Sequence, residues 1–121
     1  MTPSEPDLLT LLATTPARSA GRCCFLLQVR PDRLAEYVEA HQHVWEDMRD
    51  ALTAAGWRNY SLFLREDDGM VVGYFEAEDV DAAQAAVGST DVAGRWEAAM
   101  GEYFAPGGAD KQVLPQYFHL P

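Results

Sequence analysis

Residues 23–56 carry the clearest signals for secondary structure, and they read CCFLLQVRPDRLAEYVEAHQHVWEDMRDALTAAG. Residues 23–30 alternate in a way that is typical of a β-strand. Pro31 suits the first turn of a helix, and residues 32–55 then repeat apolar side chains at helical spacing. Gly56 is a common stop at the end of a helix. The stretch therefore predicts a strand followed by one long helix.

The next two segments predict a β-hairpin. Residues 57–65 and 70–78 both favour strands, and the Asp68-Gly69 pair between them is a strong signal for a hairpin turn. A strand, a helix and two further strands therefore account for residues 23–78.

The last part of the chain predicts two shorter helices and a final strand. One helix is expected from about residue 79 to 87, and another over residues 91–104. Residues 112–120 predict a strand that contains Pro115. Because proline has no backbone N–H to donate, this strand is expected at a sheet edge or with a bulge.

The order β-α-β-β-α-β predicts an α+β protein of the ferredoxin-like class. Four antiparallel strands would be covered by helices on one face only, and the other face would still need a cover. We expect a second copy of the chain to supply it, which gives a dimeric α/β barrel. The proline-containing residues 1–20 predict a flexible N-terminal extension, and residues 21–121 predict the domain itself.

Composition excludes several classes of partner. The chain has 9 Lys and Arg against 19 Asp and Glu, so its formal net charge is −10. Such a chain repels phosphate backbones and anionic lipids, which argues against nucleic-acid binding and membrane association. Acidity is no obstacle to an uncharged small ligand. The adjacent Cys23 and Cys24 form no disulfide framework, and no segment resembles a signal peptide or a membrane span, so we expect a reduced, cytoplasmic protein.

His41 is the most informative candidate for chemistry. The helical spacing predicts that His41 shares one face with Tyr37 and Trp45. It can be a buried structural histidine, which is the more common case, or a general acid/base, since its ordinary pKa is about 6.5. His43 would lie about 200° away around a continuous helix, so the pair is not expected to bind a metal ion.

Two aromatic residues are candidates for the wall of a pocket. Tyr60 and Trp96 can simply belong to the core, as aromatic residues in amphipathic elements usually do. Alternatively, they can offer a flat surface to the C–H face of a sugar. Glu97, next to Trp96, can be an ordinary solvated charge on a helix.

The chain resembles the L-rhamnose mutarotase family over residues 22–121. The segments that carry the resemblance are residues 25–29, Tyr37 with His41 and Trp45, Asn59-Tyr60, residues 89–92, Arg95-Trp96 and the ending 118–121. Their order and spacing together are specific, although each segment alone is weak.

This resemblance implies a ferredoxin-like homodimer that interconverts the α and β anomers of L-rhamnose without a cofactor or a metal ion. It implies that His41 is the proton donor. It also implies that Tyr37, Tyr60 and Trp96 contact the sugar. A related 6-deoxy-L-sugar such as L-fucose also stays open as the substrate, because the chain departs from the family at Glu97.

The chain departs from the family at Glu97, where the family typically has a second tryptophan. Glu97 can accept a hydrogen bond from a differently placed hydroxyl, or it can lie outside the site. Two other functions stay open: a cofactor-free monooxygenase-like or polyketide-tailoring enzyme on the same dimeric barrel, and a non-enzymatic dimeric binding module.

Overall fold

The structure is a computed structural model that describes residues 5–14 and 21–121. Its elements are α1 (Leu8–Thr14), β1 (Arg22–Gln28), η1 (Pro31–Arg33), α2 (Leu34–His41), α3 (Glu46–Ala54), β2 (Arg58–Arg65), β3 (Met70–Glu76), α4 (Val80–Gly88), α5 (Asp91–Met100), η2 (Gly101–Tyr103) and β4 (Gln112–Leu114). This order confirms the predicted alternation of strands and helices.

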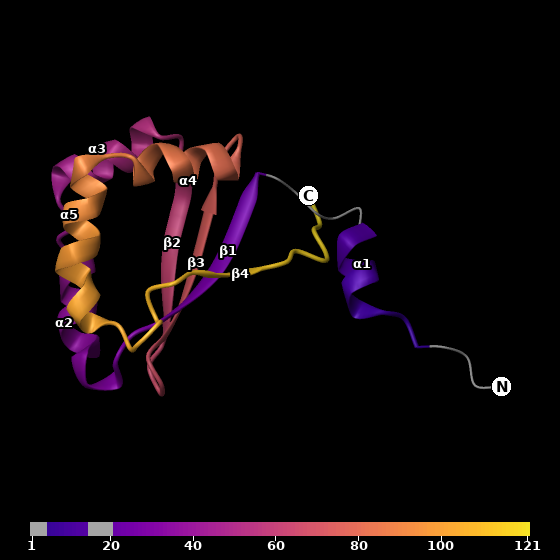
Figure 1. Ribbon diagram of the computed structural model, residues 1–121, viewed down its shortest axis with the longest axis horizontal. Helices are drawn as coiled ribbons and strands as arrows, with labels where there is room; N and C mark the ends of the chain where they lie inside the picture. The colour runs from indigo at the N-terminus through magenta and orange to yellow at the C-terminus, as the bar shows by residue number, and fades with distance from the viewer. Residues whose placement is uncertain (1–4, 15–20) are drawn as a thin grey trace.

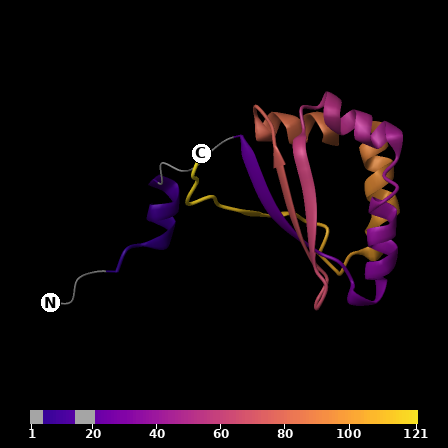
Figure 2. The same cartoon turned by 180° about the vertical axis from the view of Figure 1, so that it is seen from behind.

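The four strands form one antiparallel sheet in the order β2-β3-β1-β4. Helices α2 to α5 all lie on one face of this sheet, as Figures 1 and 2 show from opposite sides. The arrangement confirms the predicted α+β, ferredoxin-like fold.

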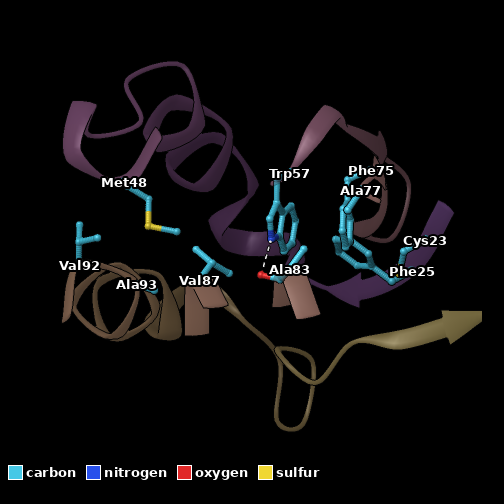
Figure 3. Close-up of a cluster of buried hydrophobic side chains, with 10 residues drawn as sticks. All are labelled: Cys23, Phe25, Met48, Trp57, Phe75, Ala77, Ala83, Val87, Val92 and Ala93. Atoms are coloured by element: carbon cyan, nitrogen blue, oxygen red, sulfur yellow. Dashed lines mark hydrogen bonds between the residues drawn. The ribbon is translucent and has the colours of Figure 1, made fainter. Parts of the chain in front are cut away.

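The main core lies between the sheet and the helices (Figure 3). Phe25 of β1 and Phe75 of β3 are fully buried, and the ring of Trp57 stacks on Phe75 with centroids 3.7 Å apart. The indole Nε1 of Trp57 donates a hydrogen bond of 3.1 Å to the carbonyl oxygen of Ala83 in α4. Trp57 therefore ties the start of β2 to the helical layer.

Gly73 makes room for this core. A Cβ at Gly73 would clash with the ring of Phe25, which lies directly over the glycine backbone. The absence of a side chain at this position of β3 thus lets a phenylalanine of the neighbouring strand pack against the sheet.

The single helix predicted over residues 32–55 is wrong, because the chain leaves the helical path at residues 42–45. Trp45 has an extended backbone (φ −54°, ψ 138°) and precedes the first turn of α3. The break lets Val44 and Trp45 pack on the core, and α3 restarts with two acidic residues, which suit a helix N-terminus. The exposed His43 lies in the break, so its predicted position on a continuous helix is wrong.

Helix α3 ends where the sequence predicted. Gly56 follows it with a φ of +98°, a left-handed conformation that glycine adopts without strain. The predicted stop is therefore confirmed.

The last strand is shorter than predicted. It spans Gln112–Leu114 rather than residues 112–120, and it ends immediately before Pro115, which has no N–H to continue the ladder. Its predicted edge position is confirmed, since β4 pairs with β1 alone among the strands of residues 5–14 and 21–121.

The N-terminal extension is described only in part. Residues 1–4 and 15–20 lie outside the described residues, so its predicted flexibility stays a prediction. Helix α1 stands apart from the sheet and its helices in both views (Figures 1 and 2), and Leu8, Leu9 and Leu11 on it are exposed.

The described helices leave one sheet face uncovered. The alternation of the strands turns the following side chains to that face: Cys24, Leu26, Phe63, Val72, Tyr74 and Leu114. The exposed fraction of Phe63 is 63%, a large value for an aromatic side chain in a strand. The predicted need for a cover on this face therefore holds for the described part of the chain.

Candidate active site

All five residues singled out from the sequence line one cavity of about 960 Å³ between the sheet and the helices. They are Tyr37 and His41 from α2, Tyr60 from β2, and Trp96 and Glu97 from α5. A cavity of this size lies within the usual range for small-molecule sites. The fold thus brings together residues that lie up to 60 positions apart in the chain.

His41 is the last residue of α2, and its ring is fixed by the helix itself. Its Nδ1 lies 2.9 Å from the carbonyl oxygen of Tyr37, one turn earlier. A carbonyl oxygen can only accept, so Nδ1 carries the hydrogen and Nε2 is left to exchange a proton. Burial lowers the pKa of His41 below its ordinary 6.5, and the bond to Tyr37 only partly opposes this shift. The imidazole is therefore mainly neutral at pH 7.

Aromatic rings surround the imidazole. The His41 ring centroid lies 4.3 Å from that of Tyr37 and 5.3 Å from that of Trp96. Trp45 contacts Trp96 edge to face, with centroids 5.0 Å apart. Trp45 therefore reaches the site through Trp96 and not, as the spacing predicted, along one continuous helix face.

The two tyrosines are both hydrogen-bond donors at neutral pH. Burial raises the pKa of Tyr37 to about 12. Burial also raises the pKa of Tyr60, and the nearby Tyr37 hydroxyl adds to this effect. Because both phenols keep their protons, they can donate hydrogen bonds to the oxygens of a ligand.

Lys111 and Trp57 are among the lining residues that the sequence did not predict. Lys111 places its Nζ 5.0 Å from the ring centroids of both Phe25 and Trp57. Trp57 itself also lines the cavity, and its ring lies 4.9 Å from that of Tyr60. The pairing of β4 with β1 would have placed Lys111. Val113 pairs with Phe25, and Lys111 lies two residues earlier, so its side chain turns to the same face of the sheet as Phe25.

The site has the means for proton transfer and for packing on an uncharged ring. It offers an imidazole with a free Nε2, two phenol donors and several aromatic faces. Among residues 5–14 and 21–121, no group of three His, Cys, Asp or Glu side chains is placed to hold a metal ion. In the same ranges, no helix has the length and hydropathy that a membrane span requires.

Comparison with known sequences points to one family. A family profile described as L-rhamnose mutarotase matches residues 22–120. An L-rhamnose mutarotase of Opitutus terrae is 35% identical over 105 residues, which cover 82% of this chain and 97% of the relative.

Comparison with solved structures supports the fold. The structure of an L-rhamnose mutarotase from Formosa agariphila matches with a TM-score of 0.69 at 17% identity, covering 83% of this chain and 98% of that one. A protein from Nitrosomonas europaea described as an antibiotic biosynthesis monooxygenase matches with a TM-score of 0.60 at 16% identity, covering 83% and 90%. These structural likenesses show a shared fold, whereas the sequence match extends over nearly the whole domain. The chain therefore belongs to the L-rhamnose mutarotase family.

Proposed function

We propose that the protein interconverts the α and β anomers of L-rhamnose or a related 6-deoxy-L-sugar such as L-fucose. The observation that carries this proposal is His41, whose ring is fixed through Nδ1 in a cavity walled by aromatic residues. Membership of the L-rhamnose mutarotase family supports the same reaction.

The reaction moves one proton. The anomeric hydroxyl loses its proton, the bond between the anomeric carbon and the ring oxygen breaks, and the ring oxygen gains a proton. The open-chain aldehyde then rotates and closes on its other face by the reverse steps. General acid/base catalysis supplies rate gains of about 10²–10⁴-fold, which suits a reaction that already proceeds in water.

One imidazole suffices for both transfers. The hydroxyl oxygen and the ring oxygen are bonded to the same anomeric carbon, so a single nitrogen can reach both. In our proposal the neutral Nε2 of His41 takes the proton from the hydroxyl and delivers it to the ring oxygen. The lowered pKa of His41 supports this order, because the resting ring must have a free lone pair.

The other residues of the cavity hold the sugar. We assign hydrogen-bond donation to sugar oxygens to Tyr37 and Tyr60, and packing on the ring to Trp96. Apolar C–H groups of a sugar and the methyl of a 6-deoxy sugar both suit aromatic walls. No cofactor or metal ion is required by this scheme.

The fold alone is shared with the monooxygenase-like protein of Nitrosomonas europaea. Fold similarity at this identity does not transfer an activity. No feature of the cavity favours a monooxygenase-like or polyketide-tailoring reaction or a non-enzymatic module over mutarotation.

We further propose that the protein is a cytoplasmic homodimer. The uncovered sheet face, with exposed Phe63 and Leu114, is apolar enough to pack against the same face of a second copy. Both cysteines are free in the structure, and free thiols persist in a reducing compartment.

Saturation-transfer NMR on a panel of aldoses tests the activity. With L-rhamnose or L-fucose, the protein is expected to raise the rate of exchange between the two anomeric proton signals far above that of buffer. An unchanged exchange rate with every sugar of the panel would overturn the proposal.

A further inference from the structure

Lys111 is the only lysine in the chain, and it points into the candidate active site. It immediately precedes the edge strand β4, where a lysine ordinarily turns to solvent. Here its Nζ lies over the rings of Phe25 and Trp57, 5.0 Å from each centroid. A charged donor is thus held against two aromatic faces at the cavity wall.

Glu97 lines the same cavity and acts on this ammonium group. Although Lys111 as a whole residue is exposed, burial around its Nζ lowers its pKa, and the nearby Cys23 thiol and Glu97 carboxylate oppose that shift. No hydrogen bond to Lys111 Nζ or to the Glu97 carboxylate is found among the described residues. The ammonium group of Lys111 can therefore donate a hydrogen bond to a ligand, and the carboxylate of Glu97 can accept one.

Lys111 contacts other rings than those that surround His41. His41 contacts Tyr37 and Trp96, whereas Lys111 lies over a different pair of rings. Tyr60 lies between the two regions, because its ring contacts Trp57 and the Tyr37 hydroxyl adds to the rise in its pKa. Because His41 and Lys111 line one cavity, a single sugar can contact both.

We propose that Lys111 and Glu97 form a subsite for two adjacent hydroxyls of the sugar, on the ring edge opposite the anomeric carbon. In an aldopyranose those are the hydroxyls on C3 and C4. The ammonium donates to one hydroxyl oxygen, and the neighbouring hydroxyl donates to the carboxylate. This inference rests on the proposed function and deepens it by naming a specificity-determining pair.

The kinetics of variants at Lys111 and Glu97 test the subsite. Lys111→Met keeps the length of the side chain but removes the charge, and it is expected to raise the apparent KM for L-rhamnose at least ten-fold, more than it lowers kcat. Lys111→Arg, which keeps a cationic donor, is expected to recover part of the loss. Glu97→Gln is expected to raise KM as well, whereas Glu66→Gln in the distant hairpin turn serves as the unchanged control.

Deoxy sugars sharpen the test. The wild-type protein is expected to prefer L-rhamnose over its 3-deoxy or 4-deoxy analogue, and Lys111→Met is expected to lose most of that preference. If Lys111→Met and Glu97→Gln both keep the wild-type KM and the wild-type preference, the subsite is wrong.

The single lysine allows a second measurement that needs no variant. An amine-selective acylating reagent can modify only Lys111 and the α-amino group of the chain, and the two rates are read by mass spectrometry. L-Rhamnose is expected to slow modification of Lys111 and to leave the α-amino group as an unchanged internal control. If Lys111 is modified at the same rate with and without sugar, at concentrations that saturate exchange, the proposal is wrong.

The outcomes separate this inference from the proposed function. Normal exchange with no effect at Lys111 overturns the subsite alone. Sugar-dependent protection of Lys111 without faster exchange supports the subsite and overturns the mutarotase activity. If sugars neither exchange faster nor protect Lys111, both are wrong.

Discussion

The Nδ1 atom of His41 lies 2.9 Å from the backbone carbonyl oxygen of Tyr37, one turn earlier in α2. A carbonyl oxygen has two lone pairs, so that of Tyr37 can accept a hydrogen bond from an imidazole as well as from the helix backbone. The contact selects the tautomer with a free Nε2. The end of α2 thus both positions the histidine and prepares it for proton transfer.

The pH dependence of exchange follows from the lowered pKa of His41. Since the neutral ring is the active form in our proposal, kcat/KM is expected to rise with pH through a midpoint below 6.5 and to be flat above it. Exchange in buffer alone is subtracted at each pH, and the C2 proton shifts of the histidines give the midpoint independently by NMR.

A profile that falls as pH rises through the same midpoint would contradict this order of transfer. It would mean that the imidazolium is the resting form. A histidine midpoint at or above 6.5 in the assigned His41 signal would contradict the burial argument itself.

Trp96 offers a second test, because it contacts His41 on one side and Trp45 on the other. Trp96→Ala removes the aromatic wall and is expected to raise the apparent KM by about ten-fold or more, the effect of losing about 1.4 kcal/mol of binding free energy. Trp96→Phe keeps an aromatic face and is expected to lose much less. Equal KM values for both variants and the wild-type protein would show that the sugar does not pack there.

The contact between Gly73 and Phe25 predicts a stability effect. Gly73→Ala is expected to lower the free energy of unfolding by about 1–3 kcal/mol, because the added methyl overpacks the ring of Phe25. Adding Phe25→Leu is expected to recover part of the loss, which thermal or urea unfolding measures.

Gly94→Ala is the matched control for that experiment. Its Cβ would meet nothing within 4 Å, and Gly94 lies inside α5. Replacing an internal helix glycine by alanine stabilises by up to about 1 kcal/mol. If both substitutions change stability alike, the close approach at Gly73 is not the cause.

The uncovered sheet face predicts the oligomeric state. Val72 lies in the middle of this face, opposite Leu26 and Phe63 in the neighbouring strands. The wild-type protein is expected to sediment as a dimer, and Val72→Asp is expected to sediment as a folded monomer. Leu9→Asp on α1, which changes an exposed leucine elsewhere, is expected to leave the dimer intact. A wild-type protein that is monomeric at tens of micromolar would contradict the proposed interface.

The fold was predictable from the sequence because its signals are local. The alternation of β1, the turn at Asp68-Gly69 and the stop at Gly56 all appear in the structure. The break between α2 and α3 was not predictable in this way, because the apolar spacing continues through it. Packing of Trp45 against Trp96, a contact between distant segments, accompanies the break.

The candidate site was predictable in part for the same reason. Tyr37 and His41 lie one helical turn apart, so their proximity is a local property of α2. Lys111 could not be placed, because its direction depends on how the edge strand pairs with β1. The sequence shows that the chain has a single lysine, but only the pairing of the strands shows that this lysine lines the cavity.

Anomer exchange by the His41→Asn variant tests whether His41 carries the proton between the two sugar oxygens. Asparagine keeps a polar side chain at the end of α2 but cannot carry a proton between two sugar oxygens. With L-rhamnose, the wild-type protein is expected to accelerate exchange, and the variant is expected to match buffer while its circular dichroism and melting temperature stay close to wild type. A folded His41→Asn variant that exchanges the anomers as fast as the wild-type protein would contradict the account.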